Sequence, residues 1–166
     1  MYRFKPLIMA LIALFIMYSL YFLLKHWQVG ITYQSTPSMP EGYYLTYKVK
    51  SIQRENNVIF MPNQKTEKFI IQHGWLPEGI PLLKRVIGIP GDKLCIKHHM
   101  VYINNKRVAV AKLKDNKGEA LPIFTYCGEI QPDYYFVQGI SSPNSFDSRY
   151  YGLIKREQII SKAVKL

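Results

Sequence analysis

The chain has 166 residues, enough for one domain with a hydrophobic core and one accessory segment. Its formal net charge of +11 would fit a nucleic-acid-binding protein, but the basic residues are scattered, with the densest stretch at 106–117, and no helix-turn-helix or zinc-finger pattern accompanies them. We therefore expect an exposed basic face near anionic lipid, and no binding of nucleic acid.

An uncharged apolar run near the amino terminus predicts a membrane-spanning helix. Residues 6–24, PLIMALIALFIMYSLYFLL, would form a helix about 28 Å long, close to the hydrocarbon thickness of a bilayer, about 30 Å. The alternative is a cleaved secretory signal, whose apolar core is about 7 to 15 residues long and is followed by an A-x-A site. The longer run here, with no such site after it, favours a retained anchor.

Basic residues flank this run unequally and predict its orientation. Arg3 and Lys5 precede it, whereas Lys25 alone marks its far end, so the positive-inside rule leaves the amino terminus in the cytoplasm. The chain then divides into residues 1–25, a cytoplasmic amino terminus with a transmembrane anchor, and residues 26–166, an outer domain. In a bacterium this is a single-pass protein of the inner (cytoplasmic) membrane with its domain in the periplasm.

The outer part consists of short apolar runs separated by Pro, Gly and Asn, which predicts a mainly β domain. A hairpin is expected at 100–110, because Asn104 and Asn105 tolerate the positive φ of a tight turn. One short helix is expected over 64–75, where Gly74 could cap it. The other predicted strands cover residues 42–49, 57–61, 81–89, 93–97, 134–139 and 158–166.

Two cysteines, Cys95 and Cys127, lie in the outer part. Alone they cannot form a four-ligand metal site, and neither belongs to a C-x-x-C motif. In an oxidising compartment we expect them to pair in one disulfide, worth about 3 to 4 kcal/mol for a loop of this size.

A lysine within an apolar strand is the first candidate for chemistry. In PLLKRVIGIPGD, period-two alternation puts Lys84 on the same face as Leu82 and Val86, with Arg85 on the opposite face. Burial lowers the pKa of a lysine and makes it a candidate general base. The alternative is a lysine whose amine snorkels to water at a sheet edge.

Two loops carry further candidates. In QSTPSMPEGYY, Ser38 stands in a Pro-rich stretch, where a serine is ordinarily a turn residue. In PNSFDSRYYG, Asp147 and Arg149 lie on the same side of an extended segment and could form an ion pair, which in isolation is an ordinary surface pair. Ser145 is by itself an ordinary loop residue.

Taken together, these motifs resemble the type I signal peptidases, the membrane-bound Ser/Lys proteases of family S26. Ser38 in STPSMP, Lys84 in LKRVIGIPGD and Asp147 in NSFDSRYYG stand in the order of that family, and the resemblance runs from the anchor to nearly the end of the chain. TPSMPEGY, HGWLPEGIPLLKRV, SFDSRYYG and the paired cysteines look like the TraF-type peptidases of bacterial conjugative transfer, which mature pilin subunits.

The resemblance implies a signal-peptidase-like antiparallel β domain behind the anchor and a catalytic Ser/Lys dyad. Ser38 Oγ would attack the scissile carbonyl while neutral Lys84 takes its proton. The Ser38 N–H and the Thr36 hydroxyl would hold the oxyanion, and Ser145 would orient the lysine amine. Met39 would suit an apolar surface at the bilayer.

The resemblance gives a supporting role to an Asp/Arg pair and no role to the histidines. Asp147 and Arg149 would lock their loop against the catalytic core. The scheme needs no cofactor, no metal and no histidine, so His73, His98 and His99 are expected at the surface or in loops.

The resemblance also implies a substrate that is itself membrane-bound: a pilin or another exported precursor, met at the lipid bilayer, with conjugation machinery as a further partner. Whether the enzyme only trims a pilin or also joins the pilin's ends into a ring stays open. Thr36 stands where a Ser is common and keeps a hydroxyl. One residue of the general pattern is missing between Met39 and Pro40, and residues 139–142 replace a GDNR run; these two departures favour the conjugation branch over a general leader peptidase I. Another class of Ser/Lys enzyme, the self-cleaving repressors, would need a DNA-binding domain in the place where this chain has its anchor. The alternative that is not an enzyme is a non-catalytic anchored scaffold of a secretion or conjugation apparatus.

Overall fold

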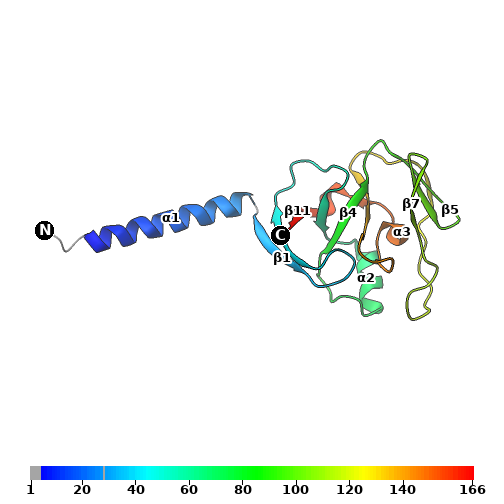
Figure 1. The fold of residues 1–166 in the computed structure, drawn as a ribbon, viewed down its shortest axis with the longest axis horizontal. Coiled ribbons are helices and arrows are strands. Elements are labelled where there is room, and N and C mark those ends of the chain that lie inside the picture. The colour runs from blue at the N-terminus through cyan, green and yellow to red at the C-terminus, as the bar shows by residue number, and fades with distance from the viewer. Residues whose placement is uncertain (1–4, 28) are drawn as a thin grey trace.

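The computed structural model describes residues 5–27 and 29–166 as a long helix followed by a β-rich domain (Figure 1). The prediction of a mainly β, antiparallel domain is confirmed. In chain order the elements are α1 (Lys5–Trp27), β1 (Gly30–Gln34), β2 (Gly42–Tyr47), β3 (Asn57–Phe60), α2 (Gln64–Gln72), β4 (Leu82–Gly88), β5 (Lys93–Lys97), β6 (Met100–Ile103), β7 (Lys106–Val110), β8 (Tyr126–Glu129), β9 (Tyr134–Gln138), α3 (Ser148–Tyr151), β10 (Ile154–Lys155), the 3-10 turn η1 (Arg156–Gln158) and β11 (Ile159–Lys165).

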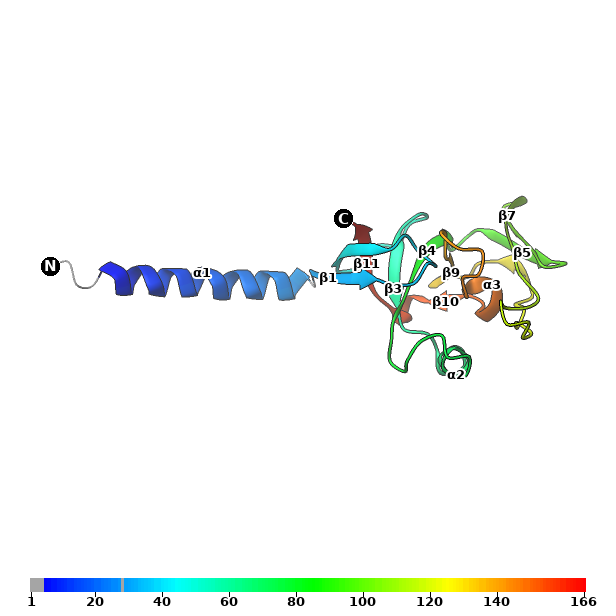
Figure 2. The same ribbon diagram turned by 60° about the horizontal axis from the view of Figure 1, so that its bottom comes forward.

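Helix α1 projects away from the domain (Figures 1 and 2), and none of its 23 residues is buried. Within the part of the chain that the structure describes, it is the helix long and apolar enough to cross a membrane, with a mean hydropathy of 2.5 over its most apolar window. Arg3, on which part of the predicted orientation rests, lies outside the described residues.

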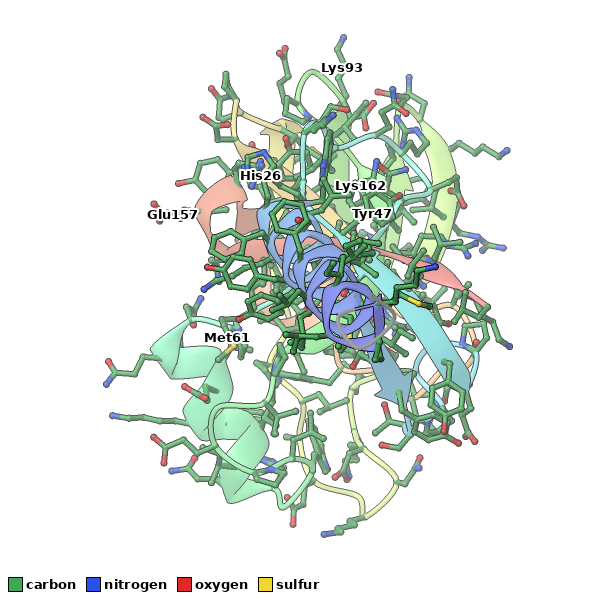
Figure 3. All side chains as sticks on the ribbon, turned by 90° about the vertical axis from the view of Figure 1, so that its left-hand side faces the viewer. His26, Tyr47, Met61, Lys93, Glu157 and Lys162 are labelled. Carbon is green, nitrogen blue, oxygen red and sulfur yellow. A yellow bond between two sulfur atoms is a disulfide. The ribbon has the colours of Figure 1, made fainter. Side chains whose placement is uncertain are left out.

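The carboxyl end of α1 is tied to the domain through Trp27. Lys48 N donates to the Trp27 carbonyl at 3.1 Å, and Lys50 Nζ lies 4.4 Å from the centroid of the Trp27 ring. Figure 3 looks along α1 onto the domain and shows Lys162 of β11 beside Tyr47 of β2, where Lys162 Nζ lies 5.9 Å from the ring centroid.

The larger sheet has the strand order β1-β2-β11-β3-β4-β9-β10, with every neighbouring pair antiparallel. Five of its strands were predicted, with ends that agree to within two residues. Strand β1 was not predicted, because residues 30–34 follow the anchor directly and look like its continuation. It pairs with β2 so that Tyr33 lies opposite Tyr43.

The smaller sheet has the order β7-β6-β5-β8 and lies at the end of the domain away from α1 (Figure 2). The hairpin prediction is confirmed: Asn104 and Asn105 turn between β6 and β7 with φ of 51° and 66°. Strand β8 was not predicted. It places Cys127 opposite Cys95 of β5, and a disulfide joins the two.

Strand β9 is buried on both faces and joins two hydrophobic cores. Tyr135 and Val137 pack with Val86 in the core of the larger sheet, whereas Phe136 packs with Leu94 in the core of the smaller one. This is the period-two alternation of a strand covered on both sides. Strand β9 therefore contributes to both cores, and so does its neighbour β4, the strand that carries Lys84, with Val86 in the first core and Ile87 against the second.

Helix α2 begins and ends at recognisable caps. Asn63 precedes it, and its side chain accepts a hydrogen bond from Thr66 N at 2.9 Å. The helix ends at Gln72, three residues before the predicted end at 75, and Gly74 follows with a φ of 67°.

Candidate active site

Ser38 lies in the loop between β1 and β2, and the residue after it anchors that loop in the core. Met39 is fully buried among Tyr44, Ile59, Leu83 and Ala163. The expectation that Met39 faces the bilayer is therefore wrong: the pocket beneath the loop is apolar and takes the side chain instead. With Met39 buried, Ser38 is held at the surface of the domain in a defined position.

Lys84 lies next to Ser38, although the two are 46 residues apart in the chain. Its Nζ donates a hydrogen bond to Ser38 Oγ at 2.8 Å. The side chain shares a strand face with Leu82 and Val86, as the alternation predicted, and the residue is only 4% exposed. The alternative of a lysine that snorkels to water is therefore excluded.

Burial changes the acidity of this lysine. Loss of hydration lowers the pKa of Lys84 from 10.5 to about 8, with Asp147 opposing this shift and Arg149 adding to it. About one such amine in ten is then neutral at pH 7, compared with fewer than one in a thousand for an exposed lysine. A neutral amine in contact with a serine hydroxyl can accept its proton.

Thr36 lies on the other side of the serine hydroxyl. Its Oγ1 is 3.3 Å from Ser38 Oγ and accepts a hydrogen bond from Gln34 Nε2 at 2.5 Å. Gln34 Nε2 also donates to the Thr36 carbonyl at 2.8 Å. Because Gln34 occupies an acceptor site of the hydroxyl, the Thr36 proton is free to point toward the reaction centre.

Gln34 was missed in the sequence. No local pattern indicates it, because β1 ends at Gln34 and the following residues 36–39 form bends and turns, so that only the folded loop brings Gln34 to Thr36. The Ser38 N–H makes no hydrogen bond within residues 5–27 and 29–166, and so it is also free to bind an oxyanion.

Asp147 and Arg149 form a buried ion pair, which corrects two expectations. Arg149 Nε and Nη2 donate to the two Asp147 carboxylate oxygens at 2.7 and 2.8 Å, and the residues are 3% and 0% exposed. The pair is therefore not an ordinary surface pair. The segment is also not extended: Asp147 caps the amino end of helix α3 by accepting a hydrogen bond from Arg149 N.

The same pair ties three parts of the domain together. Arg149 also donates to the carbonyls of Ser145 and Val110, at 2.8 and 2.9 Å, and Asp147 accepts from Gly139 N at 3.0 Å. The loop between β9 and α3, helix α3 itself and strand β7 thus share one buried charge network. This arrangement fits the supporting role that the resemblance implied.

Gly139 separates the nucleophile loop from Ser145, and sequence reasoning gave it no role. A Cβ added at Gly139 would lie 2.1 Å from Ser145 Oγ and 2.6 Å from the Ser38 carbonyl oxygen. Ser145 is buried, and its Oγ has no hydrogen-bond partner among the described residues. Ser145 is thus next to the site, but no hydrogen bond joins it to the Lys84 amine.

The histidines lie elsewhere in the described part of the chain. His98 and His99 form the turn between β5 and β6, with φ of 47° and 65°. His73 lies in the turn that follows α2, as expected of a loop residue, and it is partly covered: its side chain is 14% exposed, its ring stacks on Phe69 at 3.9 Å, and its Nε2 lies 3.2 Å from a Glu119 oxygen. Residues 5–27 and 29–166 contain no cluster of His, Cys, Asp and Glu that could hold a metal ion.

Comparison with known proteins places this geometry in a family. Probable signal peptidase I-2 of Synechocystis sp. is 28% identical over 120 residues, which are 72% of this chain and 50% of that protein. Conjugal transfer protein TraF of Agrobacterium tumefaciens is 26% identical over 145 residues, 81% of this chain and 80% of that protein. A crystal structure of a signal peptidase I from Enterococcus faecalis aligns with a TM-score of 0.41 at 23% identity, over 69% of this chain and 97% of that chain.

The chain spans half the length of the Synechocystis relative. The family model described as signal peptidase, peptidase S26, matches residues 3–166, which include α1, Ser38 and Lys84. The apolar helix and this match together indicate a membrane-anchored protein. With Ser38 and Lys84 in contact inside the matched region, the chain belongs to the signal peptidase family, peptidase S26.

Proposed function

We propose that this chain is a membrane-anchored serine endopeptidase of the signal peptidase type, with Ser38 as nucleophile and Lys84 as general base. One observation carries the proposal: the Nζ of a buried lysine with a pKa of about 8 lies 2.8 Å from the Oγ of a serine at the surface. A scaffold that only binds would gain nothing from burying an amine against a hydroxyl, because burial of a charge costs free energy.

The chemistry follows from the two contacts of the serine hydroxyl. Neutral Lys84 takes the proton as Ser38 Oγ bonds to the scissile carbonyl carbon, and the Ser38 N–H and the Thr36 hydroxyl stabilise the oxyanion. Protonated Lys84 then gives its proton to the leaving amine as the peptide bond breaks. A water, or an amine, attacks the acyl-enzyme in the second half of the reaction and releases the serine.

In this proposal the helix α1 and the substrate are held in the same membrane. We place α1 in the bacterial inner membrane with the domain in the periplasm, and the substrate is an exported precursor held in the same bilayer. Two partners confined to one membrane meet at a raised effective concentration. An enzyme of this kind can therefore act on substrates that it binds weakly.

We further propose that the substrate belongs to a conjugative transfer system. The match to the TraF relative, over 80% of that protein's length, supports a substrate among the membrane-bound pilin precursors of conjugative transfer. A general signal peptidase I is the second candidate, because signal peptidases are among the relatives that match. Both candidates use the same dyad and differ only in substrate.

The test is the intact mass of a candidate pilin precursor, encoded near this protein, after incubation with the membrane-embedded wild type and with Ser38→Ala. We expect a shorter product that depends on Ser38. A product one water lighter than the linear form would show that the enzyme also joins the ends. If only a general secretory precursor is cleaved, the chain is a general signal peptidase and the conjugation branch is wrong.

A further inference from the structure

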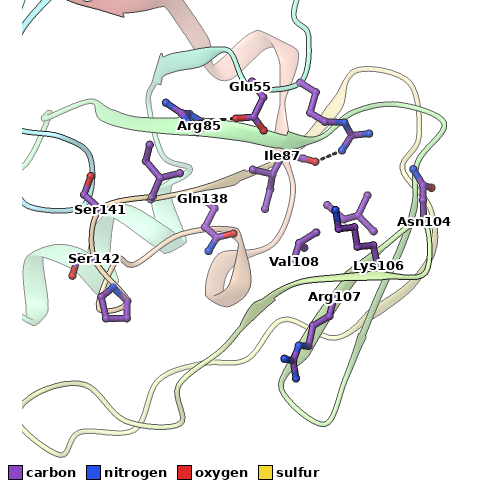
Figure 4. Close-up of a pocket in the computed structure, with 15 residues that line it drawn as sticks. Glu55, Arg85, Ile87, Asn104, Lys106, Arg107, Val108, Gln138, Ser141 and Ser142 are labelled. Carbon is purple, nitrogen blue, oxygen red and sulfur yellow. Dashed lines mark hydrogen bonds and ion pairs between the residues drawn. The ribbon is translucent and has the colours of Figure 1, made fainter.

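A basic cleft lies between the two sheets, next to the candidate active site but outside it. It has a volume of about 850 Å³, within the range of ligand-binding pockets. One wall is formed by β4 and the segment before β3, the second by the β6–β7 hairpin, and the third by the loop after β9. Figure 4 shows Arg85 and Glu55 on the first wall, Lys106 and Arg107 on the second, and Ser141 on the third.

Four cations and one carboxylate line the cleft, and two of the cations already have partners. Arg54 donates to both carboxylate oxygens of the buried Asp92, each at 2.7 Å. Arg85 lies 3.4 Å from Glu55, whose side chain is 64% exposed, so this pair is weak. The cleft therefore keeps an excess of positive charge.

The remaining two cations, Lys106 and Arg107, follow the Asn104–Asn105 turn at the start of β7. Both are exposed, and neither side chain forms an ion pair with a carboxylate in the described part of the chain. Apolar side chains lie beside them in the same cleft, among them Ile87 and Val108. A peptide with carboxylate side chains would match this combination of free cations and apolar surface.

The cleft is continuous with the nucleophile through its third wall. Residues 139–143 line the cleft, and Ser141 N donates to the Ser38 carbonyl at 3.3 Å. On the first wall, Arg85 follows Lys84 in β4 but points to the opposite face of the strand, so the connection to the nucleophile runs through residues 139–143. A substrate peptide bound across Ser38 can therefore extend into the cleft along the surface of the domain.

We infer that this cleft binds an acidic segment of the substrate that flanks the cleaved bond. The inference rests on the proposed function for the identity of the bound chain as a substrate, but the binding itself can be measured separately. The position of the cleft favours a peptide over an anionic lipid, because the β6–β7 hairpin lies at the end of the domain opposite α1 (Figures 1 and 2).

The test measures binding with the full chain in a zwitterionic detergent, in the Ser38→Ala background so that cleavage cannot interfere. The probes are a short fluorescein-labelled peptide rich in Glu and its twin with Gln at every Glu position, followed by fluorescence anisotropy. Lys106→Gln with Arg107→Gln removes the two free cations. Lys97→Gln with Lys117→Gln is the matched control, since both lysines are exposed and neither lines the cleft. A thermal melt of each variant checks the fold.

We expect the Glu peptide to bind about tenfold more tightly than its Gln twin at low salt, and this preference to weaken as salt is added. The preference should disappear in the Lys106→Gln, Arg107→Gln protein and persist in the control. Equal binding of both peptides, or an equal loss in the control variant, would overturn the inference. Binding of phosphatidylglycerol vesicles that depends on Lys106 and Arg107, without binding of the Glu peptide, would assign the cleft to lipid and overturn it too.

A second arm separates this inference from the proposed function. In a cleaved precursor, Glu→Gln changes next to the cut should lower kcat/KM for the wild type and have no effect in the Lys106→Gln, Arg107→Gln protein. Failure of every precursor to be cleaved and of Ser38 to react with an acylating probe would refute the peptidase. The anisotropy result would still decide whether the cleft binds acidic peptides.

Discussion

At the scale of single residues, the proposed reaction depends on the protonation of Lys84. Its pKa of about 8 predicts that kcat/KM rises with pH, reaches half of its maximum near pH 8 and levels off about one unit higher, because only the neutral amine can accept the serine proton. The measurement is kcat/KM for one precursor from about pH 6 to 9. A flat profile between pH 6 and 9, in an enzyme limited by chemistry, would contradict the role of Lys84.

Lys84→Ala and Lys84→Met are the matched variants for this prediction, and both should abolish cleavage. Folding lowers the pKa of this lysine, so the folded chain binds its proton less tightly than the unfolded chain does. The resulting loss of stability is full below pH 8 and disappears as the pH rises toward 10.5. Lys84→Met should therefore raise the free energy of unfolding at pH 7, by up to about 3 kcal/mol, and an inactive but destabilised variant would show that burial of the amine has been misjudged.

Thr36 tests the oxyanion site. Thr36→Val removes the hydroxyl at constant shape and should lower kcat by about 10² to 10³ with little change in KM, whereas Thr36→Ser keeps the hydroxyl and should stay active. Steady-state kinetics on one precursor distinguish the two. Equal activity of the Val and Ser variants would mean that the Ser38 N–H holds the oxyanion without the hydroxyl.

At the scale of elements, the loop after β9 packs closely against the nucleophile loop at Gly139. Gly139→Ala places a Cβ 2.1 Å from Ser145 Oγ and 2.6 Å from the Ser38 carbonyl, so the two loops must separate. We expect loss of cleavage and a destabilisation of about 1 to 3 kcal/mol, measured by urea unfolding. Gly128→Ala is the control, because its nearest neighbours are 3.4 Å or more away. Full activity of Gly139→Ala would show that the two loops can move apart freely.

The disulfide links β5 to β8 across the smaller sheet. It closes a loop of 32 residues, so its reduction should remove up to about 3 to 4 kcal/mol and lower the Tm by roughly 10 °C. Cys95→Ser with Cys127→Ser should lower the Tm by the same amount and should be insensitive to reductant. An unchanged melt after reduction would mean that pairing of β5 with β8 does not depend on the bond.

Elements with a clear local pattern were predictable, and those that depend on tertiary partners were not. The Asn104–Asn105 hairpin and the Lys84 strand carry turn residues and apolar alternation that indicate them directly. Strand β8, whose sequence is YCGE, has no apolar run and exists because β5 pairs with it. Helix α3 is four residues long and depends on the Asp147 cap and its ion pair, contacts that no local pattern shows.

At the scale of the whole molecule, the order of motifs along the chain identified the candidate dyad before any distance was known. What the sequence could not show was where those motifs meet. The contact between Ser38 and Lys84 requires β1 and β4 to lie in one sheet with β2, β11 and β3 between them. The basic cleft likewise arises from the packing of two sheets, and its cations, Arg54, Arg85, Lys106 and Arg107, are scattered in the sequence.

The most direct test of Ser38 and Lys84 as a catalytic pair is the intact mass of the full chain after incubation with a serine-acylating penem. We predict one adduct on the wild type, located at Ser38 by peptide mapping, and none on Ser38→Ala or Lys84→Ala. An adduct that persists in Ser38→Ala, or a wild type that stays unmodified while folded, would contradict the assignment of Ser38 and Lys84 as a catalytic pair.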